Sequence, residues 1–521
     1  MNRKSLVIWL SLSVLTCSAQ VPYWFDNDEP SKLEPLKGLE YRTELQATGS
    51  HGKTPLWLNA NKQGLSSLER YNGYLRGAVI RPLQTDSIRR WGVGYGVDVA
   101  VPYHFTSKVV VQQAFAEARW LHGVLSVGAK EYPMELKNNT LSSGSQTLGI
   151  NARPVPQVRL ALGDYWTIPY TKGWLHMKGH IAYGRMTDEG WQHDFTRKQS
   201  KYADGLLYHS KAGYLKLSNE ERFFPLSLEV GLEMAAQFNG TAYSDVMNGT
   251  LTPMKGSGLL KGMWHAFFPA GSETSETTYK NVEGNQLGSW MMRVNYDADE
   301  WRLGFYADRF FEDHSAMLGV DYDGYGSGDE WEVKKDRRYL FYDLKDIMLG
   351  LEFNLKYDRW INDIVVEYLY SQYQSGPVYH DHNRTIADHV GGNDDYYNHK
   401  IYPGWQHWGQ VIGNPLYRSP IYNENGKIYI ENSRMMALHL GIDGRPLEHF
   451  QYRVLATYQE GLGTYDQPYL KKHHNASFMV EGRYSFPQNW TLKGAYAMDF
   501  GHILGHNAGF QLTLSKSGIL K

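Results

Sequence analysis

Hydrophobic and polar residues alternate with a period of two along many segments of this chain, and residues 91–101 show the pattern most clearly. In WGVGYGVDVAV every odd position is apolar or aromatic, and every even position is small or polar. Because successive side chains of a strand point to opposite faces, this segment is predicted to be a two-faced β-strand. Its length, with Trp91 and Tyr103 near its ends, is typical of a tilted membrane-spanning strand. A half-buried strand of a soluble sandwich fits this one segment equally well.

The recurrence of the pattern decides between these two alternatives. Alternating segments are predicted at residues 39–48, 71–81, 91–101, 109–120, 122–130, 157–163, 177–186, 206–217, 228–238, 287–296, 301–310, 338–342, 347–355, 364–373, 435–442, 452–458, 477–484, 491–498 and 508–514. Short links alternate with long ones, as in outer-membrane barrels. Closure would remove the exposed edges of so many strands. We therefore predict an all-β protein: a transmembrane antiparallel outer-membrane β-barrel of about 18 strands, with minor helical elements, among them part of residues 54–67.

The start of the chain has the features of an export signal. Residues 1–19 contain Arg3 and Lys4, an apolar core and small residues before the predicted cleavage site. A lipoprotein interpretation would use Cys17 as the acylated residue, but Thr16 before it fits poorly. We predict a signal peptide at 1–19, a periplasmic leader at 20–37 and the barrel at 38–521, with long loops at 239–283 and 376–430. The predicted location is the cell outer membrane.

The composition is consistent with such a barrel. The 521 residues contain one cysteine and 14% aromatic residues, yet the mean hydropathy is −0.51. No run of eighteen apolar residues follows the signal peptide, so no membrane-spanning helix is predicted. The formal net charge of −2 argues against a nucleic-acid partner. An exported, aromatic-rich chain without a transmembrane helix is typical of an outer-membrane barrel, whose lumen is polar.

Residues 321–332 partly match a calcium-binding loop. Asp321, Asp323, Asp329 and Glu332 occupy ligand positions of the template, but its fifth position is Tyr325, which supplies no carboxylate. The flanking segments are predicted strands rather than helices. We interpret the segment as an acidic, glycine-rich surface loop, and we predict no metal and no cofactor.

The loop at 376–430 combines aromatic residues with histidine, aspartate and asparagine. Aromatic rings cover the apolar face of a sugar, and polar side chains exchange hydrogen bonds with its hydroxyl groups. The predicted glycan-binding residues are His380, Asp381, His382, Asp394, Tyr396, Tyr397, Asn398, Trp405, His407, Trp408 and Asn414. The alternative is a folded loop that plugs or caps the lumen, and the two interpretations are compatible. A metal site at the His-x-His pair lacks a third ligand at a diagnostic spacing.

Motifs of catalysis are missing from the sequence. It contains no G-x-S-x-G nucleophile elbow, no H-E-x-x-H and no phosphate-binding glycine loop. We predict that the protein is not an enzyme and has no catalytic residues, while a barrel-embedded lipid or glycan hydrolase stays an alternative.

Several long segments resemble the capsule-assembly Wzi family, in its Bacteroides-type branch. They are TPLWLNANKQGLSS (54–67), LSSGSQTLGINARPVPQVRLALGDYWTIPYTKGW (141–174), GVDYDGYGSGDEW (319–331), YLFYDLKDIMLGLE (339–352) and YYNHKIYPGWQHWGQVIGNPLYRSPIY (396–422). The resemblance implies an outer-membrane barrel of about eighteen strands with periplasmic helical elements. It also implies a lectin-like protein that holds capsular or other surface polysaccharide on the cell. No sugar-contacting motif of the family transfers to particular residues of this chain.

The functional hypothesis is therefore a monomeric outer-membrane protein that binds and anchors an acidic or neutral surface polysaccharide through its extracellular loops. Its partners would be this polysaccharide and outer-membrane lipid. A passive, porin-like diffusion channel is the alternative.

Overall fold

The computed structural model describes residues 36–87, 90–245, 249–256, 258–268, 284–312, 317, 324–325, 328–335, 346–380 and 389–520. The predicted signal peptide and most of the leader lie outside the described residues, as do the predicted strand at 338–342 and residues 321–323 and 326–327 of the calcium-like loop. The chain divides into two units, residues 1–35 and residues 36–521, and the second unit holds the fold described below.

Eighteen strand positions form one antiparallel sheet that closes on itself, which confirms the predicted barrel. The strands are β1 (Glu40–His51), β2 (Tyr71–Arg81), β3 (Trp91–Tyr103), β4 (Val110–Trp120), β5 (Gly123–Ala129), β6 (Gln157–Leu162) with β7 (Trp166–Thr167), β8 (Leu175–Arg185), β10 (Leu207–Leu217), β11 (Leu226–Phe238), β14 (Asn285–Asp297), β15 (Trp301–Phe311), β18 (Ile347–Leu355), β19 (Asp363–Tyr370), β24 (Met435–Leu447), β25 (Phe450–Gly463), β26 (Pro468–Phe486), β27 (Trp490–Gly501) and β28 (Asn507–Ile519). The seam pairs β1 with β28, from Glu40 opposite Ile519 to His51 opposite Ala508.

The two faces of the wall follow the alternation of the sequence. On β3, Val97 and Val101 are more than half exposed on the outside, whereas Asp98 and Ala100 are buried inside. Asp98 accepts a hydrogen bond from Nε of Arg76 on the neighbouring strand β2 at 2.8 Å. An apolar outer face and a polar inner face are what a barrel in lipid requires.

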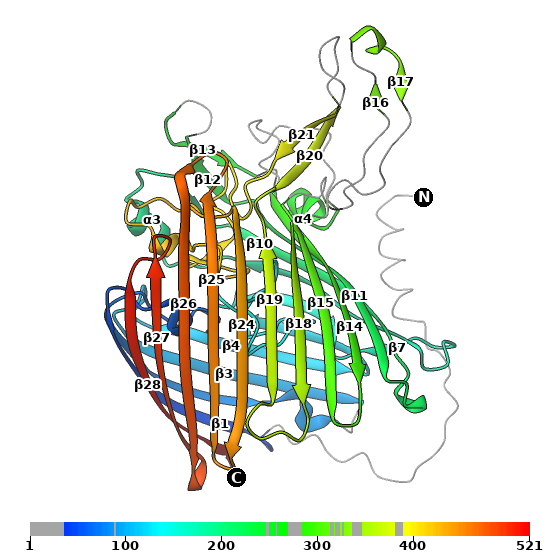
Figure 1. Ribbon diagram of the computed structural model, residues 1–521, viewed down its shortest axis with the longest axis vertical. Coiled ribbons are helices and arrows are strands. Elements are labelled where there is room, and N and C mark those ends of the chain that lie inside the picture. The colour runs from blue at the N-terminus through cyan, green and yellow to red at the C-terminus, as the bar shows by residue number, and fades with distance from the viewer. Residues whose placement is uncertain are drawn as a thin grey trace. The chain divides into compact units, whose positions relative to one another are not determined.

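The connections divide the barrel into two ends (Figure 1). At one end the turns are short, such as residues 121–122 and 448–449. At the other end the connections are long and carry the small elements. These are α2 (Leu56–Asn59), α3 (Trp191–Thr196), α4 (Leu259–Phe267), β9 (Tyr202–Asp204), β12 (Thr241–Ser244), β13 (Thr252–Lys255), β16 (Gly324–Tyr325), β17 (Lys334–Lys335), β20 (Ser375–His380), β21 (His389–Asn393), β22 (Gln406–His407) and β23 (Gln410–Val411), with short 3₁₀ turns that include Pro420–Tyr422. None of the described helices has the length and apolar character needed to cross a membrane.

Three segments from the long-loop end fold into the lumen. They are residues 52–68, 131–156 and 394–433, which we call the plug. Leu58, Leu141 and Trp405, one from each segment, belong to a single buried cluster that also contains inward side chains of the wall. The lumen of the barrel is therefore packed as a protein core.

Candidate functional site

Carboxylates of the wall hold the plug by its backbone. The hydrogen-bonded pairs are Asp499 with the N–H of Leu56 (3.1 Å), Glu367 with Ser143 (2.8 Å), Asp308 with Gln146 (3.1 Å) and Glu233 with Leu148 (3.3 Å). Each of these carboxylates is at most 1% exposed. Asp308 also forms a buried ion pair with Lys137 of the plug. Hydrogen bonds to a buried charge are strong, and a buried carboxylate that lost its donors would be costly. The wall and the plug are thus held together at four strands.

Trp405, predicted to stack on a sugar from an exposed loop, lies fully buried in the plug. Its indole Nε1 donates to the carbonyl oxygen of Thr147 at 3.0 Å, and its ring stacks on Tyr208 of β10 with centroids 5.9 Å apart. Both faces and the polar edge of the ring are occupied by protein. The predicted exposure of this side chain is corrected: it packs the lumen.

The other described loop residues share this location. Asp394, Tyr396, Tyr397, Asn398, His407 and Asn414 are all buried. Tyr397 accepts a hydrogen bond from the backbone N–H of Asn414 at 3.0 Å, and the Asn414 amide donates to the carbonyl oxygen of Gly144 at 3.0 Å. The second of these hydrogen bonds joins two plug segments. The position of these residues fits the alternative interpretation of the loop, in which it folds into the lumen as a plug. That these residues bind glycan stays a prediction.

His407 is one of the most enclosed polar groups of the plug. Its ring nitrogens lie 2.8 Å and 2.7 Å from the carbonyl oxygens of Arg153 and Thr187. Burial lowers the pKa of His407 to about 4, while the two carbonyl contacts favour the protonated ring and oppose this shift. Of the predicted histidine pair, His380 ends β20 and its side chain is not among the described ones, while Asp381 and His382 lie outside the described residues.

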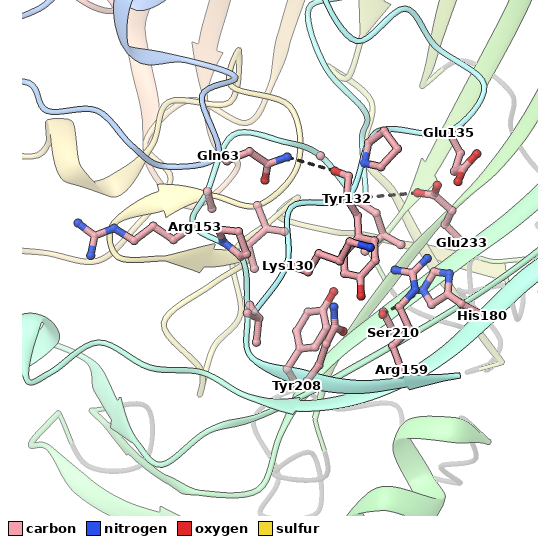
Figure 2. Close-up of a pocket in the computed structure, with 18 of the residues that line it drawn as sticks. Gln63, Lys130, Tyr132, Glu135, Arg153, Arg159, His180, Tyr208, Ser210 and Glu233 are labelled. Carbon is pink, nitrogen blue, oxygen red and sulfur yellow. Dashed lines mark hydrogen bonds between the residues drawn. The ribbon is translucent and has the colours of Figure 1, made fainter. Parts of the chain in front are cut away.

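A cavity lies between the plug and the wall (Figure 2). It measures about 80 Å³ and is lined by charged and aromatic side chains, among them Lys130, Tyr132, Glu135, Arg159 and Glu233. The guanidinium of Arg159 lies over the Tyr132 ring at 4.0 Å. A volume of this size holds a few water molecules, whereas small-molecule sites usually measure several hundred Å³. This cavity is a small polar gap in the packing with room for water.

A groove of about 830 Å³ opens at the long-loop end. Its walls are residues 52–53, 67–70, 105–108 and 188–195 together with plug residues 408 and 421–424; α3 carries part of it and is visible at this end in Figure 1. Its aromatic side chains are Phe105, Trp191, Phe195, Trp408 and Tyr422. The rings of Trp191 and Phe195 stack with centroids 4.9 Å apart. The groove has the size and the mixed lining of a ligand site.

Trp408 connects the groove to the plug. The guanidinium of Arg153 lies 4.2 Å from the centre of its ring, and the same guanidinium donates to the hydroxyl groups of Thr106 and Ser107 at 3.0 and 2.7 Å. Burial lowers the pKa of Arg153 to about 10, which leaves it charged at pH 7. Of the predicted stacking residues that the structure describes, Trp408 is the one that lines the groove, and its side chain is buried against Trp191 and Ile428.

The charges of the groove are mixed. Three cations, Lys53, Arg70 and Lys108, face five carboxylates, Glu69, Asp188, Glu189, Asp194 and Glu424, which gives a formal net charge of −2. Lys53 pairs with Glu424 at 2.9 Å. The carboxylate of Asp188 accepts hydrogen bonds from the N–H groups of Gly190 and Gln192 and so shapes the start of α3. Sequence reasoning missed residues 188–195, although an aromatic pair spaced four apart between two alternating strands could have indicated them.

The closed, even-numbered antiparallel sheet, its apolar outer face and its gathered long loops define an outer-membrane type of β-barrel. Among solved structures, Wzi of Escherichia coli is similar to this chain, with a TM-score of 0.54 and 11% sequence identity over 91% of this chain and 83% of that one. Wzi is described as an outer membrane protein involved in group 1 capsule assembly and as a carbohydrate-binding β-barrel. At this identity the likeness concerns the fold.

Two structures from Pseudomonas aeruginosa are also similar. OccD3 (OpdP) has a TM-score of 0.45 and 10% identity over 94% of this chain and 93% of that chain. OccK2 (OpdF), solved in complex with glucuronate, has a TM-score of 0.45 and 9% identity over 93% and 98%. No protein-family model matches the sequence, and no curated protein sequence matches it.

Proposed function

We propose that this protein is a monomeric outer-membrane lectin of the Wzi type, which binds capsular or other surface polysaccharide and anchors it at the cell surface without altering it chemically. The observation that carries the proposal is the aromatic groove at the long-loop end of a barrel whose lumen is filled. In outer-membrane barrels the end with long loops faces outward, which is the side where surface polysaccharide lies. The fold similarity to a carbohydrate-binding barrel supports the proposal.

The groove is suited to a polymer. An aromatic contact contributes about 1 kcal/mol, so the partly exposed Phe105 and Phe195 together support only weak binding of one sugar unit. A polysaccharide presents the same unit many times, and repeated engagement by many barrels in one membrane raises the effective affinity without new contacts. Weak single sites are adequate for retention at a surface.

The predicted ligand is an acidic or a neutral glycan, and the charge of the groove favours one of these two. With two more carboxylates than cations, the groove disfavours a strongly acidic chain. We propose a neutral polysaccharide as the better ligand. Binding should then change little between low and high salt, because no net charge attraction would be screened.

The test is binding of the purified, detergent-folded protein to polysaccharide from its own host. The Phe105→Ala/Phe195→Ala double variant removes two aromatic side chains of the groove. The matched control is Tyr357→Ala/Trp360→Ala, which removes two exposed aromatic side chains at the short-turn end. We expect the groove variant to lose binding and the control to keep it. Equal binding by both variants would remove the groove from the proposal, and no binding by the wild type would remove the lectin role.

A further inference from the structure

Helix α4 has large apolar side chains on the side that faces away from the barrel. Leu260, Trp264 and, just past its end, Phe268 are 82%, 62% and 48% exposed. They are spaced four residues apart, so they lie along one side of the helix. The rings of Trp264 and Phe268 are in contact, with centroids 4.6 Å apart. Exposed apolar side chains that form a continuous stripe on a helix mark a contact surface.

The opposite side of α4 packs on the outer face of the wall. Ala266 is buried against Ala236 and Phe238 of β11. On the same strand, Ala235 belongs to the lumen cluster, and the Gln237 amide points to the carbonyl oxygen of the plug residue Gln406. Because neighbouring residues of a strand face opposite sides, positions 236 and 238 lie on the outside. The helix therefore lies outside the barrel, against β10 and β11 at the long-loop end.

The wall beneath α4 carries polar groups among its apolar side chains. Its outward side chains include Tyr183, Lys211 and Gln286, and all three donate to backbone carbonyl groups of the helix. Tyr183 donates to Met263 at 3.0 Å, Gln286 donates to His265 at 3.0 Å, and Lys211 donates to Phe267. Lipid could accept none of these hydrogen bonds, so the helix shields the polar patch from it.

We propose that outer-membrane lipid covers the exposed side of α4, which thereby replaces the missing stretch of the barrel's apolar belt. The stripe is continuous with that belt, since Ile181 on β8, Leu215 on β10 and Val230 on β11 are exposed apolar side chains of the strands that the helix covers or adjoins. Trp264 stands at the end of the barrel where Tyr71 and Tyr103 are exposed on other strands. Aromatic girdles at this level mark the boundary between lipid and water.

The exposed stripe of α4 lies on the outside of the barrel and would contact lipid, whereas the groove would contact polysaccharide. The proposal for α4 does not depend on polysaccharide binding. The groove is mixed and charged, whereas the stripe has no charged side chain among its three members. A helix with one face on protein and the other in the outer leaflet acts as an anchor of the long-loop end in the membrane.

Fluorescent labelling tests the proposal directly. The one cysteine of the chain, Cys17, is replaced by serine, and single cysteines are introduced as Leu260→Cys, Val97→Cys and Asn425→Cys. Val97 is an outward belt position on β3, and Asn425 is an exposed loop residue. Each variant is labelled with an environment-sensitive dye and reconstituted into phosphatidylcholine vesicles. Quenching is measured with spin-labelled lipid in the bilayer and with iodide in the water.

We expect lipid to quench the Leu260 probe within about twofold of the Val97 probe, and iodide to quench it several-fold less than the Asn425 probe. A spin label near the lipid headgroup should quench the Leu260 probe more strongly than a spin label deep in the bilayer. The proposal would be overturned if iodide quenched the Leu260 probe as strongly as it quenches the Asn425 probe. A second result would also overturn the proposal: neither quencher reaches the Leu260 probe, and Leu260→Cys forms cross-links between two copies of the protein. In that case a second copy of the chain covers the helix. Retained heat-resistant migration on gels establishes that each variant is folded.

Discussion

Two segments of this protein are rich in aromatic residues, and they have opposite surroundings. Residues 394–414 lie in the lumen, where the ring and the indole N–H of Trp405 are satisfied by Tyr208 and Thr147. Residues 188–195 lie at the rim, where Trp191 is buried against Trp408, and the Phe195 ring that stacks on it is partly exposed beside an open groove. Both segments have the composition of a sugar-binding loop. What separates Trp405 from Phe195 is whether the protein itself covers the whole ring.

Replacement of Trp405 by alanine should have the largest effect. Removal of this fully buried side chain from the plug is expected to lower the free energy of unfolding by about 3–5 kcal/mol. Urea titration of the folded protein in vesicles measures this. A Phe195→Ala variant serves as the reference, because its side chain is only partly buried. A Trp405→Ala protein of wild-type stability that no longer binds polysaccharide would reverse the assignment of the two segments.

The wall carboxylates should rank second. Glu367→Ala leaves the N–H of Ser143 and the hydroxyl of Ser142 without their acceptor, at an expected cost of about 2–3 kcal/mol. Glu367→Gln is the milder control, since it keeps one accepting oxygen. Hydrogen exchange at residues 141–148 should speed up in the alanine variant, and conductance in a planar bilayer should appear more often than in the wild type. Unchanged exchange would mean that these contacts do not hold the plug.

The pH dependence of the plug follows from His407. Its folded pKa of about 4 lies below the ordinary value of 6.5, so the unfolded chain binds a proton first as the pH falls. Stability should therefore be full above pH 6.5 and should decrease as the pH falls toward 4, with a loss of about 2 kcal/mol at pH 5. Urea titrations at pH 7.5 and pH 5 measure the loss. His407→Gln should show a smaller difference between the two pH values, and an equal difference would assign the effect to other groups.

The smallest change is expected at the groove. Phe195→Ala should weaken polysaccharide binding by about fivefold per site, equivalent to about 1 kcal/mol, and should leave the unfolding midpoint nearly unchanged. Binding to a surface with immobilised short oligosaccharides separates this single-site effect from avidity. Loss of stability without loss of binding would make the groove side chains part of the packing.

The barrel could be predicted from sequence because the pattern that indicates it is local. On β3 the apolar positions face outward and Asp98 faces inward, as the alternation requires. The predicted strand at 477–484 begins nine residues later than β26 does, because residues 468–476 are mostly polar and do not alternate. The local pattern of the sequence could not predict that residues 394–433 lie in the lumen. Burial of Trp405 and Asn414 depends on partners such as Thr147 and Gly144, which lie more than 250 residues away in the chain.

The seam between β1 and β28 has a consequence for the order of assembly. It pairs residues that are 479 positions apart, Glu40 and Ile519, so the ring closes only after the last strand of the chain is available. The plug is subject to the same delay, because Leu56 is fastened by Asp499 on the last strand but one. Contacts this distant in sequence form slowly. The earliest part of the plug therefore waits for the latest part of the wall, and loss of the C-terminal strand would leave both an open edge and an unfastened core.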